Sequence, residues 1–427
     1  MTGFPWFTYR DGRLYAEGVA LDDIAAQVGT PAYVYSSQAL TDRYQSLAEA
    51  FAGTDHLIAY AMKANASLAI LRHFRDLGAG ADVVSGGELQ IAMKAGIAPQ
   101  KIIFAGVGKT REEMALAIKS GIAQFNVESE PELHVLSDVA VSLGTKAPIA
   151  IRINPDVDAK THKKITTGKA ANKFGIAYQR AHEVYAEAAK LPGIEIVGVH
   201  VHIGSQLTDL APYDATFARL AELVTSLRAA GHAIRRIDLG GGIGITYDEE
   251  TPPDARSYAN LVRKHMGKLD CEFALEPGRY LVGNAGLLLT RVTFVKQAEQ
   301  KTFLILDSGM NDLIRPAMYE AYHRIVPVKS PKPGANQAPV DIVGPVCETG
   351  DTFAEDRPMP PADAGDLLAI LSAGAYSSAM ASTYNARPLA PEVLVSGDRF
   401  AITRRRATID EMTALETLPA WLNEVKA

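Results

Sequence analysis

The feature that most constrains the fold is a series of eight short apolar segments between residues 56 and 275, separated by stretches of helical character. Each segment ends in polar residues or glycine. The segments are His56–Met62, Gly80–Val84, Lys101–Ala105, Gln124–Val127, Pro148–Ile153, Gly198–Ile203, Arg236–Leu239 and Glu272–Leu275. Eight β-then-α units in sequence predict a closed parallel barrel with right-handed crossovers, that is, a (β/α)8 TIM-like barrel. A doubly wound open sheet is the alternative, but eight consecutive units favour closure.

Helix start signals support this alternation. Three strand-to-helix junctions carry the pattern of a capping box, Ser or Thr followed three residues later by Glu. These pairs are Ser85 with Glu88, Thr110 with Glu113, and Ser129 with Glu132. A first helix is expected near residues 37–52, where apolar side chains recur on one face before a terminal glycine. They are Leu40, Tyr44, Leu47 and Phe51, followed by Gly53.

Both ends of the chain have the texture of β structure. Asp11-Gly12 lies between segments 7–10 and 13–16, which predicts a tight type I′ hairpin. Strands are also expected beyond residue 285, with Pro-rich connectors at 327–339 and 352–363. They are Thr290–Lys296, Thr302–Leu306, Val340–Val343, Leu367–Leu371 and the hairpin Glu392–Ile402.

The expected fold class is therefore α/β plus all-β. Residues 31–285 form the barrel, and residues 286–427 form a β-sandwich or β-barrel domain. We expect the N-terminal hairpin to pair with this second domain, so that residues 1–30 complete it and the domain is discontinuous in sequence.

Composition excludes several classes of protein. The net charge is −6 with both signs mixed along the 427 residues, and no basic run suggests a nucleic-acid partner. No stretch approaches the roughly 18 apolar residues of a membrane span, and the N-terminus has no basic region followed by an apolar run, as a signal peptide would. The two cysteines, Cys271 and Cys347, are too few for a disulfide framework. We expect a cytoplasmic protein with no membrane partner.

Polar residues gather where the barrel strands end. In a (β/α)8 barrel the chemistry is at the carboxyl ends of the strands, so these residues should surround one mouth. They are Lys63, Asp82, Ser85, Arg152, Asn154, His200, His202, Gly240–Gly244, Glu276 and Arg279. Taken alone, a lysine such as Lys63 just past an apolar strand is more often a solvated loop residue.

The glycine loop Gly240-Gly241-Gly242 is the plainest physical signal. Consecutive glycines let backbone N–H groups approach an anion, and a following helix N-terminus adds partial positive charge. As an isolated motif it is as compatible with a tight turn. Because it follows a late barrel strand, a frequent phosphate site in this fold, it favours a phosphate-bearing cofactor or substrate.

Five motifs resemble, in order and approximate spacing, those of the alanine-racemase-fold, pyridoxal-phosphate (PLP)-dependent decarboxylases. They are Tyr60-Ala61-Met62-Lys63-Ala64-Asn65, His202-Ile203-Gly204-Ser205-Gln206, Gly240-Gly241-Gly242, Glu276-Pro277-Gly278-Arg279 and Gly344-Pro345-Val346-Cys347-Glu348. The form His-Ile-Gly-Ser-Gln is similar to the members of the family that act on meso-diaminopimelate. Cys-Glu points the same way, since ornithine decarboxylases carry Cys-Asp.

The resemblance implies a PLP site. Lys63 would hold PLP as a Schiff base, and His202 would stack on the pyridine ring, although a core histidine is the alternative. Glu276 would keep the ring nitrogen protonated and so strengthen the electron sink, where a racemase would have arginine. No metal is implied. The remaining cofactor-binding residues implied are Asp82, Ser205, Gly240, Gly241, Gly242, Pro277, Gly278, Arg279 and Tyr376, the last of which could instead be a core aromatic.

The resemblance also implies a substrate with two amino-acid ends. Arginine forks suit its distal carboxylate and Glu348 suits its distal ammonium. The implied substrate residues are Arg279, Arg315, Tyr319, Glu348 and Tyr376, although a surface ion pair is the alternative for Arg315. The implied reaction turns meso-2,6-diaminopimelate into L-lysine and CO2, the last step of lysine biosynthesis.

Cys347 would return a proton to the α-carbon, although a lone cysteine is more often inert. The family's Cys-Glu pair reaches into the partner subunit, which implies a homodimer with shared active sites. The segment His162–Phe174 is similar to the family's mobile loop. Within the same fold, decarboxylation of ornithine, arginine or lysine is the alternative function. A non-catalytic PLP carrier is disfavoured by the large β-domain with Cys347, and a racemase is disfavoured by Glu276.

Overall fold

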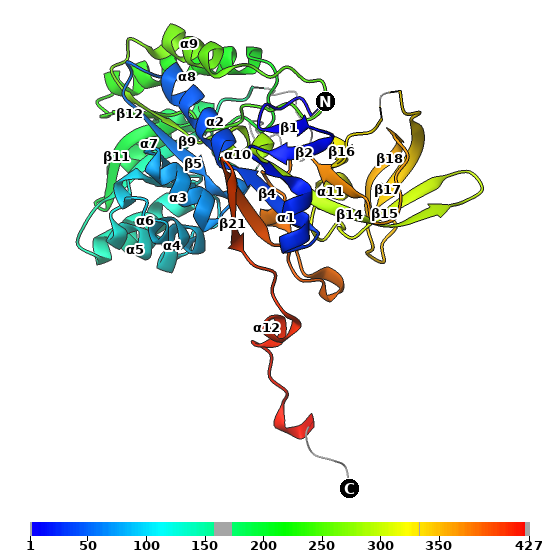
Figure 1. The fold of residues 1–427 in the computed structure, drawn as a ribbon. Coiled ribbons are helices and arrows are strands. Elements are labelled where there is room, and N and C mark those ends of the chain that lie inside the picture. Colours follow the sequence, from blue (N-terminus) through cyan, green and yellow to red (C-terminus); the bar gives the residue numbers. More distant parts are fainter. Residues whose placement is uncertain (1, 158–172, 333, 423–427) are drawn as a thin grey trace. The chain divides into compact units, whose positions relative to one another are not determined.

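The computed structural model describes residues 2–157, 173–332 and 334–422 (Figure 1). It divides into two compact units. The first, called the β unit below, comprises Met1–Tyr35, Leu287–Leu371 and Met380–Ala427. The second, called the barrel unit, comprises Ser36–Gly286 and Ser372–Ala379.

The barrel unit contains a closed parallel barrel, which confirms the predicted fold class. Hydrogen bonding runs from β5 through β6, β7, β8, β9, β11 and β12 to β13, and β13 pairs with β5 to close the ring. The strands are β5 (His56–Ala61), β6 (Gly80–Val83), β7 (Ile102–Phe104), β8 (Gln124–Val127), β9 (Ala147–Asn154), β11 (Ile194–His200), β12 (Arg236–Asp238) and β13 (Glu272–Leu275). The short β10 (Ile176–Ala177) pairs with the end of β9.

Helices separate the barrel strands and lie outside them, as Figure 1 shows for α3 to α7. The α-helices are α2 (Ser37–Ala50), α3 (Leu68–Asp76), α4 (Gly86–Lys94), α5 (Arg111–Ser120), α6 (Glu130–Ser142), α7 (Ala181–Ala188), α8 (Ala211–Ala229), α9 (Ala255–Met266) and α10 (Arg279–Val282). Single 3-10 turns are η1 (Met62–Ala64), η2 (Pro99–Lys101), η3 (Tyr178–Arg180) and η4 (Gly283–Ala285). Helix α2, which was expected near residues 37–52, buries Leu40, Tyr44 and Leu47, as its periodicity predicts.

The three predicted N-caps are present, but only one is a full capping box. Thr110 accepts from the Glu113 N–H and Glu113 accepts from the Thr110 N–H. Ser85 and Ser129 each accept a hydrogen bond from the N–H three residues later, as Thr110 does. However, the glutamates of α4 and α6 accept from the N–H of the residue before the serine and not from that of the serine itself. Both serines are more extended, with φ near −155° and −159° against −80° for Thr110, and this turns their own N–H groups away from the glutamates.

The β unit is built on a sheet ordered β18-β17-β15-β14-β4-β20-β21, with β19 also paired to β14 and β16. Its strands are β4 (Ala32–Ser36), β14 (Gly286–Gln297), β15 (Thr302–Leu306), β16 (Ile325–Pro327), β17 (Ala338–Val343), β18 (Thr352–Met359), β19 (Leu367–Ile370), β20 (Glu392–Ser396) and β21 (Arg399–Arg404). Its helical elements are α1 (Leu21–Val28), α11 (Arg315–Tyr319), η5 (Ser378–Met380), η6 (Tyr384–Ala386), α12 (Ile409–Thr413) and η7 (Ala420–Leu422), of which η5 begins in the barrel unit.

The prediction of a connector at residues 352–363 was wrong, because β18 occupies most of it and pairs with β17. Proline at 358 had argued against a strand. However, β18 lies at the edge of the sheet, where a residue without an N–H group is tolerated. The short strands β4 and β16 were also not predicted.

The N-terminal hairpin forms as predicted but does not join the large sheet. Asp11 and Gly12 have φ of 48° and 77°, as a type I′ turn requires, between β1 (Phe7–Arg10) and β2 (Arg13–Ala16). With β3 (Val19–Ala20) they form a separate three-stranded sheet. The hairpin attaches through a shared apolar core and an isolated antiparallel bridge between Arg13 and Lys329, with backbone hydrogen bonds from Leu14 to Val328 and from Ser330 to Gly12. It therefore pairs with the β unit and completes it, as expected, while staying outside the large sheet.

Residues 372–379 belong to the barrel unit, although they lie outside the range 31–285 expected for it. The Tyr376 N–H donates to the Ala64 carbonyl at 2.8 Å. Gly374 lies so close to α10 that a Cβ there would be 1.8 Å from the Val282 carbonyl oxygen. These backbone contacts return the chain to the barrel. Residues 31–35, also assigned to the barrel by sequence, belong to the β unit, since residues 32–35 form most of β4.

Among the described residues, no helix combines the length and apolar composition needed to cross a membrane.

Removing a buried leucine from α3 should destabilise the protein much more than removing an exposed one. Leu71 is fully buried, whereas Leu68 on the same helix is 43% exposed. Leu71→Ala should lower the free energy of unfolding by about 2–5 kcal/mol, because the lost methyl groups leave a cavity. Leu68→Ala should lower it by less than about 1 kcal/mol. Urea denaturation of both variants measures this, and equal losses would contradict the placement of α3.

Candidate functional site

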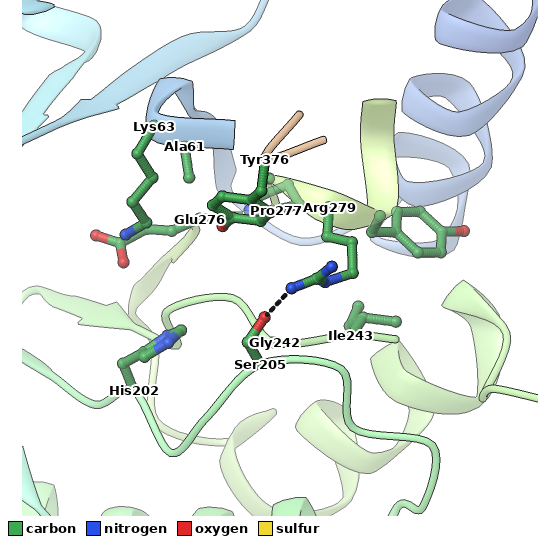
Figure 2. A pocket seen from close by; sticks show the side chains of 12 residues that line it. Ala61, Lys63, His202, Ser205, Gly242, Ile243, Glu276, Pro277, Arg279 and Tyr376 are labelled. Carbon is green, nitrogen blue, oxygen red and sulfur yellow. Dashed lines mark hydrogen bonds between the residues drawn. The ribbon is translucent and has the colours of Figure 1, made fainter. Parts of the chain in front are cut away.

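A pocket lies where the barrel strands end, and all its lining residues belong to the barrel unit. It encloses about 380 Å³ including its opening to solvent. Figure 2 shows its polar side chains pointing into one space from separate segments. The lining residues are Ala61, Lys63, His202, Ser205, Gly242, Ile243, Glu276, Pro277, Gly278, Arg279, Tyr280 and Tyr376.

Lys63 enters the pocket from the 3-10 turn that follows β5. Its Nζ donates to Asp82 Oδ2 at 3.3 Å, and the Asp82 side chain is completely buried. Burial lowers the pKa of Lys63, but the Asp82 carboxylate and other negative groups raise it by a larger amount. The pKa of Lys63 is therefore above its ordinary value. Lys63 is therefore an ammonium held against the Asp82 carboxylate.

Glu276 follows β13 and is 5% exposed. Its Oε1 accepts from Asn126 Nδ2 at 2.9 Å, and its Oε2 lies 3.4 Å from His200 Nε2. Burial, with the Asp82 carboxylate nearby, raises the pKa of Glu276 to about 8, against the opposing effect of Lys63. Figure 2 shows the side chains of Lys63 and Glu276 directed toward one another.

His202 is a neutral imidazole fixed by the glycine loop. Its Nδ1 accepts from the Gly241 N–H at 3.2 Å, which leaves the proton on Nε2. Burial lowers the pKa of His202 well below its usual value, and the cations of Arg152 and Lys63 lower it further. A neutral ring can lie against a cationic aromatic group without repulsion.

The glycine loop is required by close packing as well as by its backbone angles. Gly240 and Gly242 have φ of 63° and 108°. A Cβ on Gly241 would lie 2.3 Å from the Glu276 carbonyl oxygen, and one on Gly242 would lie 2.5 Å from that of Gly204. The N–H of Gly240 bonds Asp238 and that of Gly241 bonds His202. Two of the three amides expected at a phosphate are thus used within the protein, and only Gly242 lines the pocket.

Arg279, at the start of α10, is held from two sides. Its Nη2 donates to Ser205 Oγ at 3.2 Å, and its Nη1 donates to Tyr247 Oη at 2.6 Å. Its guanidinium carbon lies 4.8 Å from the centre of the Tyr376 ring, within cation–π range. Tyr376 has φ of 55°, a left-handed conformation that costs a non-glycine residue about 1 kcal/mol or more. Such strain often accompanies a functional side chain.

The other predicted substrate residues belong to the β unit. Arg315 is buried and its Nη1 lies 2.7 Å from His323 Nε2, so it is not part of a surface ion pair. Tyr319, at the end of α11, is half-buried, and Cys347 and Glu348 are exposed. Their expected place in the active site stays a prediction. The predicted loop His162–Phe174 lies outside the described residues, except for its last two.

Three buried polar residues of the barrel were missed by sequence reasoning as parts of the site. Asn126, Asp238 and Gln124 form hydrogen bonds with one another beneath Glu276, at distances of 2.6–3.2 Å. The available signal was the alternation Gln124-Phe125-Asn126 within an otherwise apolar strand, because alternate residues point to the same face. Asp238 lies two residues before the glycine loop, at the end of a strand that was read as apolar.

Comparison with known proteins gives consistent matches. Residues 37–283 match the family described as "Pyridoxal-dependent decarboxylase, pyridoxal binding domain". The chain is 49% identical to the diaminopimelate decarboxylase of Zymomonas mobilis, over 97% of this chain and 99% of the relative. It is 50% identical to that of Pseudomonas aeruginosa, over 96% and 99%. The crystal structure of the enzyme of that name from M. jannaschii in complex with L-lysine superposes with a TM-score of 0.94 at 39% identity, covering 99% of this chain and all of the other.

Adding a methyl group to the glycine loop should weaken cofactor binding. In Gly241→Ala the new Cβ would displace the Glu276 backbone, and overpacking of this kind costs about 1–3 kcal/mol. The dissociation constant for pyridoxal phosphate should rise about tenfold or more, as titration of the apoprotein would measure. Gly87→Ala, in helix α4 where a Cβ meets only ordinary contacts, is the matched control and should bind normally. Equal affinity of both variants would argue against the loop as a binding element.

Proposed function

Because the chain belongs to the family of pyridoxal-dependent decarboxylases, we propose that it converts meso-2,6-diaminopimelate to L-lysine and CO2, the last step of lysine biosynthesis. It is a carboxy-lyase that uses pyridoxal phosphate. The observation that carries the proposal is the near 50% identity, over almost the full length, with proteins named diaminopimelate decarboxylase. Two related crystal structures contain L-lysine, which is the expected product.

The pocket residues fit pyridoxal phosphate. Lys63 is an amine that can hold the aldehyde carbon covalently, and Glu276 is a buried carboxyl group suited to a ring nitrogen. Gly242, Ser205 and Arg279 line the same pocket, and the hydroxyl of Ser205 and the guanidinium of Arg279 are hydrogen-bond donors for a phosphate. When bound, the cofactor supplies an electron sink for the bonding pair released as CO2 leaves.

The residues of the chain then divide the work of proton handling. Lys63 must lose a proton before its amine can react, and Asp82 is the carboxylate at 3.3 Å that can accept it. Glu276 holds the proton of the ring nitrogen. The neutral His202 packs on the ring without competing for that proton. Cys347 delivers a proton to the α-carbon after CO2 has left, as the family resemblance implies.

Substrate recognition is proposed to depend on charge at the far end of the molecule. The planar guanidinium groups of Arg279 and Arg315 each suit a carboxylate, and Tyr319 and Tyr376 are the other residues that the family resemblance implies for this end of the substrate. Glu348 suits the distal ammonium. Tyr384 donates to Glu348 Oε1 at 2.8 Å and so holds that carboxylate in one orientation. A substrate with a single carboxylate would offer no second anion to these guanidinium groups.

We further propose a homodimer in which Cys347 and Glu348 complete the partner's pocket. What supports this is the family resemblance and the exposure of both side chains in the single chain. We also propose a cytoplasmic location, for which the support is the low cysteine count, with both cysteines free. No partner other than the small-molecule substrate and a second copy is proposed.

A panel of amino acids tests the proposed substrate. CO2 release should be fastest from meso-diaminopimelate and slower by about two orders of magnitude or more from lysine, ornithine and arginine, because these lack the second carboxylate and a hydrogen bond to a charged group contributes about 1.5–3 kcal/mol. Glu348→Asp, which shortens the carboxylate by one methylene, should raise KM for diaminopimelate with little change in cofactor content. Faster turnover of lysine or ornithine by the unmodified protein would replace the proposed substrate with that one.

Mixing two inactive variants tests the shared active site. Lys63→Ala and Cys347→Ala should each have little activity alone, and subunit exchange should restore it because one site of each mixed dimer retains both residues. Random exchange makes half the dimers mixed, so roughly one quarter of the wild-type sites is the ceiling. Each variant mixed with itself is the control. Verified exchange without recovered activity would mean that Cys347 serves its own barrel or has no catalytic role.

A further inference from the structure

Two carboxyl groups lie next to each other in the interior of the barrel, and the proposed mechanism uses only one of them. Asp238, the last residue of β12, is completely buried, and Glu276, just beyond the neighbouring β13, is 5% exposed. His200, at the end of β11, completes the group. One polar atom from each of the three side chains lies within 4.8 Å of the other two.

A side-chain amide links the two carboxyl groups. Asn126 Nδ2 donates to Asp238 Oδ2 at 3.0 Å and to Glu276 Oε1 at 2.9 Å. Asp238 also accepts from Gln124 Nε2 at 3.2 Å and from the Gly240 N–H at 3.0 Å. Asp238 therefore accepts three hydrogen bonds, while Glu276 accepts this one. Hydrogen bonds donated to a carboxyl group favour its ionised form, so the charge belongs on Asp238 and a proton on Glu276.

The described cations that face this pair are already paired with other carboxylates. Lys63 is paired with Asp82, and Arg152 is paired with the buried Glu128 at 2.8 Å. Burial lowers the pKa of His200, so its imidazole is neutral near pH 7. Two ionised carboxylates here would face each other with no unpaired cation beside them among the described residues. Burial, and then the charge of Glu276, raises the pKa of Asp238 to about 7. Burial, and then the charge of Asp82, raises the pKa of Glu276 to about 8.

We propose that Asp238 is a positioning residue which, through Asn126, keeps one proton on Glu276 in the barrel before the cofactor binds. The consequence rests on the proposed function. When the ring nitrogen of pyridoxal phosphate arrives, the O–H bond of Glu276 breaks and an N–H bond forms. The ring gains the proton, and Glu276 becomes a carboxylate beside it. The proton is thus stored in the protein rather than taken from solvent.

The pH dependence of unfolding of the apoprotein tests the stored proton without any assay of the loaded enzyme. In the unfolded chain a glutamate loses its proton near pH 4.3, whereas folded Glu276 keeps it to about pH 8. Between these values unfolding releases the proton, so the stability it contributes falls as pH rises. One released proton makes the unfolding constant increase about tenfold per pH unit.

Substitutions of Asp238 or Glu276 should therefore change how steeply the unfolding constant depends on pH, and not only its value at one pH. In Asp238→Asn and in Glu276→Gln, the unfolding constant should rise less steeply between about pH 7 and about pH 8, where Asp238 is ionised and Glu276 is still protonated, by up to about one power of ten per pH unit. Glu128→Gln is the matched control. The Glu128 carboxylate is buried in the same barrel, but its pKa is lowered because the attraction of Arg152 outweighs burial, so this variant should run parallel to the wild type. If the pair variants also run parallel to the wild type, the proposal is overturned.

Infrared spectroscopy of the folded apoprotein provides a second measurement if Asp238→Asn does not fold. Near pH 7 the wild type should show the C=O stretch of a protonated carboxylic acid, and Glu276→Gln should lose it. Glu88→Gln is the control, since the pKa of Glu88, raised by burial, is only about 6. An unchanged band in Glu276→Gln would overturn the proposal. Failure of the substrate assays, with the slope and band as expected, would instead count against the proposed function alone.

Discussion

Closure of the parallel ring between β13 and β5 is the constraint on which the pocket depends. The two strands are the last and the first of the barrel in sequence, and their pairing brings residue 276 beside residue 63 although more than two hundred residues separate them. Because all eight strands are parallel, their carboxyl ends form one rim. Lysine, histidine, glycine and glutamate thereby share a site that no local segment could form.

Burial inside that rim makes charge expensive, and the barrel limits it in two ways. Cations are paired one to one with buried carboxylates, as in Lys63 with Asp82 and Arg152 with Glu128. The remaining groups are kept neutral, histidines by loss of a proton and Glu276 by gain of one. An uncompensated buried charge costs several kcal/mol, so this balance is a condition for folding as well as for catalysis.

The fold could be predicted from the sequence because alternation of short apolar strands with capped helices is a strong local signal. What depended on tertiary context was not predicted. β18 was missed because its proline is harmless only at a sheet edge, and a sequence does not show which strand lies there. Two capping boxes failed because the N-cap backbone angles differ by about 75° in φ from that of Thr110.

The candidate site was only partly visible for a related reason. Residues at strand ends, such as Lys63 and Glu276, stand out against the apolar pattern that precedes them. Asn126 and Asp238 lie inside short strands, where a polar residue is usually read as facing solvent. Asn126 donates hydrogen bonds to Asp238 and Glu276, which lie 112 and 150 residues away in sequence. Only the closed ring reveals that they meet.

The return of residues 372–379 to the barrel has a consequence for how this protein can be divided. The family segment ends at residue 283, yet Tyr376 forms part of the pocket wall and is anchored to the Ala64 carbonyl. Residues 37–283, which match the cofactor-binding domain of the family, therefore do not form the complete pocket by themselves. Recombination or truncation at the end of that segment would separate the pocket from one of its own walls, so the two halves of the sequence can only be inherited together.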